Sequence, residues 1–206
     1  MTIQVKICGI NSREAYHAAA NAGAVWVGFV FFHRSPRFVT AEQAAAIASP
    51  IGPLRVGLFV EPTRASIEAV LAQFRLDVLQ LYADEEICRD MRSWFNIPVW
   101  RAVGVSARAD LPENGSGIDA MVIEAKAPAG AECPGGNAKV LDWEIMQGWH
   151  APRPWLLAGG LTPGNVAAAI AISGAKAVDV SSGVEIAPGI KSSTLINDFI
   201  RAARSA

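Results

Sequence analysis

Near its N-terminus the chain reads Val5-Lys6-Ile7-Cys8-Gly9, and this stretch predicts a short buried strand. Apolar residues alternate with Lys6 and Cys8, and Gly9 ends the run before polar residues begin. An ammonium and a thiol therefore share one face of the strand. In a closed barrel of parallel strands that face points into the barrel, and the C-terminal strand ends carry the chemistry. If the later strands close such a barrel, Cys8 lies at the rim of an active site.

Apolar, strand-like runs recur along the whole chain. They occupy residues 4–8, 25–31, 54–60, 77–81, 99–103, 120–124, 155–158 and 177–181. Most of them are continuously apolar rather than half polar. That pattern is typical of parallel strands that are buried on both faces.

Helix-like segments lie between these runs. The predicted helices occupy residues 11–22, 40–48, 63–74, 84–94, 163–172 and 192–204. Their ends carry capping residues, which are Asn11 or Ser12, Thr40, Thr63, Thr162 and Ser192 at the N-termini and Gly23 and Gly174 beyond the C-termini. Pro163 suits a first helical position, and acidic residues open segment 84–94. The helical pattern is weaker in residues 106–111 and 142–148, and it predicts only a short helical turn in each.

This alternation of strands and helices predicts an α/β fold, a (β/α)8 barrel formed by residues 1–206 as a single domain. At roughly 26 residues per unit the chain lies at the short end of that fold's range. The competing fold is a doubly wound open sheet, which would favour a glycine-rich dinucleotide-binding turn after the first strand. Gly9-Ile10-Asn11 does not supply such a turn.

The composition excludes several classes of partner. With 51% hydrophobic residues and a net charge of −1, the chain favours neither nucleic acid nor an anionic membrane surface. Its three cysteines are widely spaced, so neither a disulfide framework nor a zinc site is indicated. The histidines are isolated, and we expect no metal site. We find no signal region and no apolar run of membrane length, so the expected location is the cytoplasm.

Glycine-rich turns follow the last two predicted strands. Gly159-Gly160 comes after the seventh strand, and Ser182-Gly183 comes after the eighth. Glycines allow backbone amides to approach an anion closely, and barrels frequently bind phosphate with the loops after these two strands. The sequence therefore predicts a phosphate site here. A glycine-rich turn by itself is more often only a turn.

Four further side chains are candidates for chemistry at the strand ends. Arg37 follows the second strand, where it either lies in a solvated loop or binds a substrate carboxylate through a planar, bidentate contact. Glu124 ends the sixth strand, where burial would raise its pKa and make it an acid; the alternative is a solvated pair with Lys126. Asp179 lies between two valines and must face a partner. Cys8 is either a buried apolar residue or a base whose pKa is lowered by Lys6.

These residues resemble the phosphoribosylanthranilate isomerase family of tryptophan biosynthesis over nearly the whole chain. The resemblance is carried by residues 6–10, 28–31, 35–37, 56–60, 135–136, 142–143, 158–161, 165–166, 177–185 and 188–189. It implies an isomerase that needs no cofactor and converts N-(5-phosphoribosyl)anthranilate, a phosphorylated small molecule, by an Amadori rearrangement. It also implies site roles, which are Cys8 as general base, Arg37 at the anthranilate, Asp179 in the pocket, and Gly159, Gly160, Ser182 and Gly183 at the phosphate.

The chain departs from the family pattern at three places. Glu124 stands where the family has an aspartate as general acid, so the carboxyl reaches about one methylene further, and a misplacement of about 1 Å can cost about 10²-fold in rate. Tyr82-Ala83 replaces histidine and glycine after the fourth strand, and Asn137-Ala138 replaces a small residue and a glycine in the loop after the sixth. We expect an active enzyme, because no required group is lost.

Other functions remain open from the sequence. One alternative is another phosphosugar barrel enzyme, such as indole-glycerol-phosphate synthase or the histidine-pathway isomerase; the latter would need an aspartate at the position of Cys8. A second alternative is an inactive barrel that binds a phosphorylated ligand without turnover. The expected assembly is a monomer or a homodimer, and the sequence does not distinguish between them.

Overall fold

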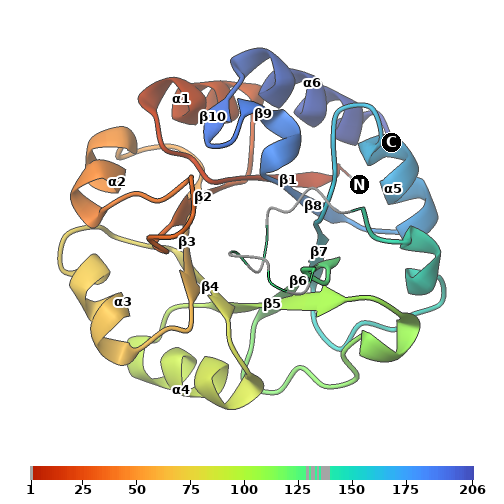
Figure 1. Ribbon diagram of the computed structural model, residues 1–206, viewed down its shortest axis with the longest axis horizontal. Helices are drawn as coiled ribbons and strands as arrows, with labels where there is room; N and C mark the ends of the chain where they lie inside the picture. The colour runs from red at the N-terminus through yellow and green to blue at the C-terminus, as the bar shows by residue number, and fades with distance from the viewer. Residues whose placement is uncertain (1, 129, 131–132, 134, 136–139) are drawn as a thin grey trace.

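In the computed structural model, eight parallel strands form a closed barrel in the order β1 to β8 (Figure 1). The structure describes residues 2–128, 130, 133, 135 and 140–206. The barrel strands are β1 (Gln4–Cys8), β2 (Trp26–Val30), β3 (Leu54–Val60), β4 (Val78–Tyr82), β5 (Val99–Val105), β6 (Ala120–Ala125), β7 (Trp155–Leu157) and β8 (Ala177–Val180). Strand β1 closes the ring by pairing with both β2 and β8. The predicted barrel is confirmed, and the open sheet is excluded.

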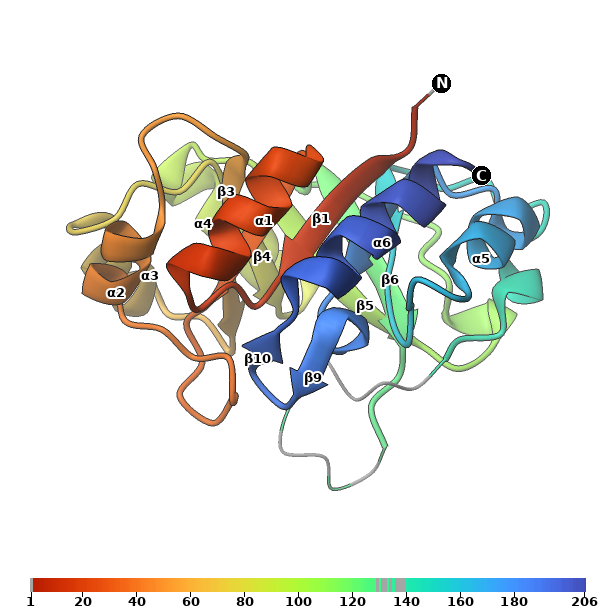
Figure 2. The same ribbon diagram turned by 90° about the horizontal axis from the view of Figure 1, so that it is seen from above.

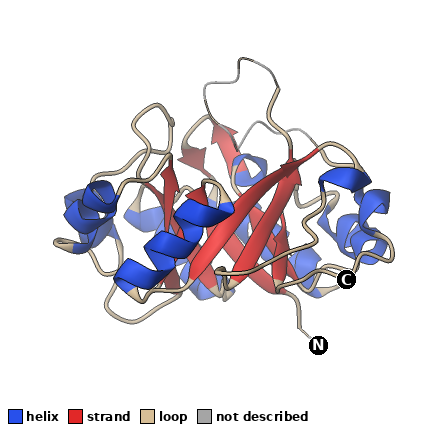
Figure 3. Cartoon of the chain, turned by 90° about the horizontal axis from the view of Figure 1, so that it is seen from below, coloured by secondary structure: helices blue, strands red, loops and turns tan. Residues whose placement is uncertain are grey.

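Six α-helices surround the described part of the barrel (Figure 3). They are α1 (Arg13–Ala22), α2 (Ala41–Ile47), α3 (Arg64–Leu71), α4 (Glu85–Phe95), α5 (Val166–Ser173) and α6 (Ser193–Arg204). The side chains of Ser12, Thr40, Thr63 and Ser192 accept hydrogen bonds from backbone N–H groups in the first turns, as the sequence predicts. Gly23 and Gly174 end α1 and α5 in the left-handed conformation.

The start of α5 differs from the prediction. Residues 163–165 form a turn, and the helix begins at Val166 instead of Pro163. Within this turn the Asn165 Oδ1 accepts from the Thr162 N–H at 2.7 Å, and its Nδ2 donates to the Gly160 carbonyl at 3.0 Å. The turn leads directly into α5, because the Val166 N–H donates to the Thr162 carbonyl at 3.1 Å.

The two weak helical segments form short 3-10 helices, η1 (Arg108–Asp110) and η2 (Trp143–Met146). In the first, Asp110 accepts hydrogen bonds from the Ser106 and Ala107 N–H groups, and Pro112 follows at once. A proline cannot continue a helix, so the segment ends there. A further 3-10 helix, η3 (Ser182–Val184), follows β8 and leads into a hairpin of β9 (Glu185–Ala187) and β10 (Ile190–Lys191). Figure 2 shows this hairpin below α6, the helix that follows it in the chain.

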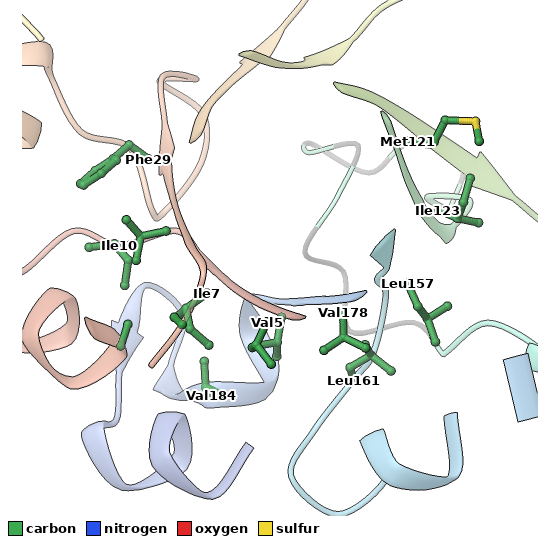
Figure 4. Packing of buried hydrophobic residues seen from close by; sticks show 14 of the residues in the cluster. Val5, Ile7, Ile10, Phe29, Met121, Ile123, Leu157, Leu161, Val178 and Val184 are labelled. Carbon is green, nitrogen blue, oxygen red and sulfur yellow. The ribbon is translucent and has the colours of Figure 1, made fainter. Parts of the chain in front are cut away.

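The alternation predicted for β1 is confirmed. Val5 and Ile7 belong to the main core outside the barrel wall, where they lie near Val184 (Figure 4). Lys6 and Cys8 point to the interior. Below them the barrel is filled by apolar side chains, including an edge-to-face pair of Trp26 and Trp100 with ring centroids 5.1 Å apart. A packed lower half leaves the C-terminal strand ends as the place where a ligand can enter. Among the described residues, no helix is long and apolar enough to cross a membrane.

Candidate active site

The side chains and glycines that the sequence analysis selected come together around one cavity at the C-terminal ends of the strands. The cavity is lined by Cys8, Arg37, Glu124, Asp179, Gly159, Gly160, Ser182 and Gly183, with Phe32, Gln80, Tyr82 and Gly135 among their neighbours. These residues come from strand ends and loops that are far apart in the sequence. Because strand ends of a closed parallel barrel meet at one rim, the fold explains their convergence. Gly136, Asn137 and Ala138 lie outside the described residues.

A buried ion pair forms the floor of the cavity. Lys6 Nζ donates to Asp179 Oδ2 at 2.9 Å, and the two residues are opposite each other in the β1–β8 register. Burial is the largest single influence on Lys6 and disfavours the ammonium, but Asp179 and Cys8 together outweigh it, so the pKa of Lys6 is raised. The expectation that Asp179 faces a partner is confirmed. Its second oxygen, Oδ1, is buried without a hydrogen-bond partner in the part of the chain that the structure describes, so it remains available to a ligand.

Cys8 lies in the same floor, with its thiol close to Lys6. Burial is the largest influence on this thiol and raises its pKa, whereas Lys6 and Lys191 act in the opposite direction. The prediction that Lys6 brings the pKa down toward neutrality is therefore wrong. The physical reason is that burial of the thiol outweighs the effect of Lys6, and that Asp179, the ion-pair partner of Lys6, raises the thiol pKa further. At neutral pH the resting group is a thiol.

Glu124, on β6, is the group of this cavity that titrates near neutral pH. Burial raises its pKa from 4.5 to about 7, a hydrogen bond from Tyr82 acts to lower it, and Asp179 raises it further. Its Oε1 is buried and has no hydrogen-bond partner among the described residues. The predicted rise in pKa is confirmed. Lys126 is exposed whereas Glu124 is buried, so the alternative of a solvated pair between them is excluded.

Tyr82 and Gly135 close around the Glu124 carboxyl group. Burial and the neighbouring Glu124 charge raise the pKa of the Tyr82 phenol well above its usual value, so it stays a hydrogen-bond donor. A side chain at position 135 would collide with the Tyr82 hydroxyl and press on both carboxyl oxygens of Glu124. A glycine is therefore required where this loop passes over the acid.

Arg37 is buried beside the cavity, but its bidentate contact is made within the protein. Its Nε and one terminal nitrogen donate to the two carboxylate oxygens of Glu185, at 2.7 and 2.8 Å. Glu185 thus occupies this edge of the guanidinium and makes the kind of planar contact that was expected with a substrate carboxylate. The other edge, formed by the two terminal nitrogens, carries the remaining donors. The alternative of a solvated loop is excluded for Arg37, because the residue is buried, and its contact with a substrate carboxylate stays a prediction.

The two glycine-rich turns line the cavity, and Gly183 of the second turn lies against Leu161 and Thr162, which follow the first. Gly159 and Gly160 have φ angles of +84° and +64°, a conformation that glycine adopts without strain. At position 183 a Cβ would collide with the Leu161 carbonyl, so the turn after β8 approaches the loop after β7 more closely than any other residue permits. The backbone of both turns is accessible from the cavity, as a phosphate site requires.

Three functional residues were missed by the sequence predictions. Gln80 is a polar residue within the apolar run 77–81, which is the same signal that identified Asp179. Glu185 and Lys191 lie on β9 and β10, and no periodicity of those short strands marks them. Their side chains are 4% and 1% exposed. Only the fold brings them to Arg37.

No group of three or more histidine, cysteine, aspartate or glutamate side chains is arranged to hold a metal ion in the residues the structure describes. The cavity holds a carboxyl group with a pKa near 7, a thiol, a guanidinium and two glycine-rich turns, and such a set suits proton transfer on an anionic substrate.

Comparisons with known proteins show which family this chain matches. Residues 5–202 match the model of the N-(5'-phosphoribosyl)anthranilate (PRA) isomerase family. The N-(5'-phosphoribosyl)anthranilate isomerase of Acidiphilium cryptum is 61% identical over 203 residues, which are 98% of this chain and 99% of that protein.

Solved structures show the same similarity. A phosphoribosyl anthranilate isomerase in complex with reduced 1-(o-carboxyphenylamino)-1-deoxyribulose 5-phosphate is 33% identical, with a TM-score of 0.84, and the match covers 99% of this chain and 100% of that one. Monomers generated from the dimeric enzyme of Thermotoga maritima are 34% identical, with the same TM-score and coverage.

Proposed function

The chain belongs to the N-(5'-phosphoribosyl)anthranilate isomerase family and is an isomerase of tryptophan biosynthesis, and on that premise we propose which of its residues carry the reaction. In this Amadori rearrangement the substrate, an aminoaldose, becomes 1-(2-carboxyphenylamino)-1-deoxyribulose 5-phosphate. The sugar ring must open, a proton must leave C2, and both anionic ends of the substrate must be held.

Glu124 is the proposed general acid. Its protonated carboxyl donates to the ring oxygen, the C1–O bond breaks, and the nitrogen lone pair forms the iminium. The observation that carries this assignment is the buried carboxyl with a pKa of about 7, whose Oε1 has no partner among the described residues. An acid with that pKa is protonated in about half of the molecules at neutral pH and still gives up its proton readily.

Cys8 is the proposed general base. As a thiolate it removes the proton from C2, the electron pair forms the C1–C2 double bond of an enolamine, and the iminium is discharged. Tautomerisation of the enol then gives the ketone. The raised pKa of Cys8 makes the thiolate a minor form at neutral pH but a strong base when formed. The neighbouring Lys6 and Lys191 ammonium groups favour it electrostatically.

The two ends of the cavity suit the two anions. We assign the phosphate to the turns at Gly159-Gly160 and Ser182-Gly183, which line one end. The anthranilate carboxylate is assigned to Arg37, through the guanidinium edge that Glu185 leaves available. Asp179 lines the same cavity, and its Oδ1, which has no partner among the described residues, is assigned to accept a sugar hydroxyl.

The test is turnover of phosphoribosylanthranilate, generated in place from anthranilate and phosphoribosyl pyrophosphate and followed by fluorescence. Glu124→Gln and Cys8→Ser should each lower kcat by about 10²–10⁴-fold, the range expected for removing a positioned acid or base. Cys88→Ala and Glu68→Gln, in the core and on the surface, control for loss of a thiol and of an acid. Turnover that survives Glu124→Gln would transfer the acid role to another group, with Asp179 the next candidate.

Three coarser expectations belong to the same proposal. We propose that residues 1–206 act as a single barrel domain, as a monomer or a homodimer, in the cytoplasm. A dimeric relative and its monomeric forms are both known in solved structures, and the cytoplasmic location follows from the biosynthetic role. Size-exclusion chromatography with light scattering would decide between the two assembly states.

A further inference from the structure

A buried triad of charges lies behind the carboxylate end of the cavity. Lys191 Nζ donates to Glu185 Oε1 at 2.7 Å, and Glu185 in turn accepts the two donors of Arg37. The exposed fractions of the three side chains are at most 9%. None of the proposed catalytic steps uses Glu185 or Lys191 directly.

The triad fixes the orientation of the Arg37 guanidinium. Glu185 holds the Nε edge of the plane, and the Gly189 N–H donates to the same carboxylate at 3.2 Å. On the other side the aliphatic stem of Arg37 lies against Gly9, where any Cβ would collide with it. A guanidinium clamped at its stem and at one edge presents its other edge in a fixed direction.

The triad also sets the net charge beside this part of the cavity. Arg37 paired with Glu185 alone would be neutral, and a neutral pair attracts an anion weakly. Lys191 donates its three protons to Glu185, the Ser181 carbonyl at 3.0 Å and the Ser181 hydroxyl at 3.3 Å, which suits an ammonium. The triad therefore carries one excess positive charge, buried next to the cavity, where water screens it little.

Lys191 additionally connects the two anion sites. Ser181 immediately precedes Ser182-Gly183, the turn assigned to the phosphate, and Lys191 binds the backbone of that residue. One side chain thus ties the phosphate turn to the arginine that faces the opposite end of the ligand. The distance between the two anion sites is held by this connection.

We propose that Glu185 and Lys191 are positioning and specificity residues that make Arg37 selective for a substrate bearing an aryl carboxylate. The inference rests on the proposed function. Glu185 orients the guanidinium, and Lys191 restores the positive charge that Glu185 cancels. Neither residue touches the reacting atoms.

The test compares two ligands by calorimetry. One is the reduced form of 1-(2-carboxyphenylamino)-1-deoxyribulose 5-phosphate, and the other is its phenylamino analogue without the carboxylate. The wild type should prefer the carboxylate-bearing ligand by about tenfold or more, as expected for a charge-assisted hydrogen bond. In Glu185→Gln and Lys191→Met this preference should fall by about tenfold, while the affinity for the phenylamino analogue stays within a few fold. The surface variant Glu68→Gln should keep the wild-type ratio.

The Glu185→Gln variant distinguishes the orientation of the Arg37 guanidinium from the net charge of the triad as the source of the preference. The variant adds one positive charge to the triad, so simple attraction predicts a stronger preference for the carboxylate, whereas loss of orientation predicts a weaker one. A stronger or unchanged preference overturns the proposal, as does a variant that loses affinity for both ligands equally, because that is a general structural effect. Wild-type protein that binds neither ligand would instead refute the proposed function.

A structure of the wild-type complex provides a second test that needs no variant to fold. The Arg37 Nε edge should remain on Glu185 while the opposite edge contacts the ligand carboxylate. If Arg37 leaves Glu185 to give the ligand its Nε edge, the proposed orientation is wrong.

Discussion

Replacing Glu124 by glutamine should stabilise the protein at alkaline pH while lowering its kcat by about 10²–10⁴-fold. The carboxyl group has a pKa of about 7 in the folded state against 4.5 as its ordinary value. Between these two pH values the folded state holds a proton that the unfolded chain has lost. Stability contributed by this site therefore falls as the pH rises from about 4.5 to about 7.

The size of this effect follows from the change in pKa. At about 1.4 kcal/mol per pH unit, the change from 4.5 to about 7 corresponds to about 3 kcal/mol. Glutamine resembles the protonated acid in shape and charge, so it avoids this cost. The variant should match the wild type near pH 4.5 and exceed its free energy of unfolding by about 3 kcal/mol above pH 7.5.

Urea denaturation at half-unit steps between pH 4.5 and pH 8.5 measures this difference directly. Glu68→Gln, in an exposed pair with Arg64, reports the effect of replacing an acid by an amide on the surface. A difference between Glu124→Gln and the wild type that does not change with pH would refute the reasoning, because it would mean that Glu124 is ionised in the folded protein throughout.

Three shorter predictions concern the same cavity. The kcat of the wild type should rise with pH up to about 7, because more Cys8 thiolate forms, and level off above pH 7, because the acid form of Glu124 is then lost; a rate–pH profile measures it, and a rise that continues without a break to pH 9 would contradict the acid role. Lys6→Met should cost about 3–5 kcal/mol in urea unfolding, since Asp179 would be left buried without its partner, and a cost below about 1 kcal/mol would show that water reaches the pair. Gly183→Ala should raise the Kd for inorganic phosphate at least tenfold in calorimetry, because its Cβ meets the Leu161 carbonyl, and unchanged binding would place the phosphate elsewhere.

Much of the fold was predictable because the local sequence signals for strands and helix caps agree with the barrel that forms. The apolar runs have the continuous character of strands covered on both faces, and the hydroxyl side chains of Ser12, Thr40, Thr63 and Ser192 cap the helices where expected. At α5 the sequence predicted the helix but not its first residue. Residues 163–165 form a turn, and the helix begins at Val166, whose N–H donates to the Thr162 carbonyl at 3.1 Å.

The sequence predicted which residues form the candidate site, but not how their pKa values are shifted. Cys8, Glu124 and Asp179 could be selected because each is a reactive or ionisable group at or near an apolar strand end. The direction in which a group's pKa moves could not be read from neighbours in sequence. Lys6 is two residues from Cys8, yet the Asp179 charge brought in by β8 and the burial of the thiol decide the outcome.

The sequence by itself determined that parallel strands close a barrel and that reactive groups gather at one rim, because strand periodicity and capping are local properties of the chain. Only the tertiary structure decided how those groups are charged and which of them face a ligand. Glu185 lies 148 positions from Arg37 in the sequence and occupies its bidentate edge. Burial and electrostatic coupling depend on distances between segments that are remote along the chain, and these distances exist only once the barrel has closed.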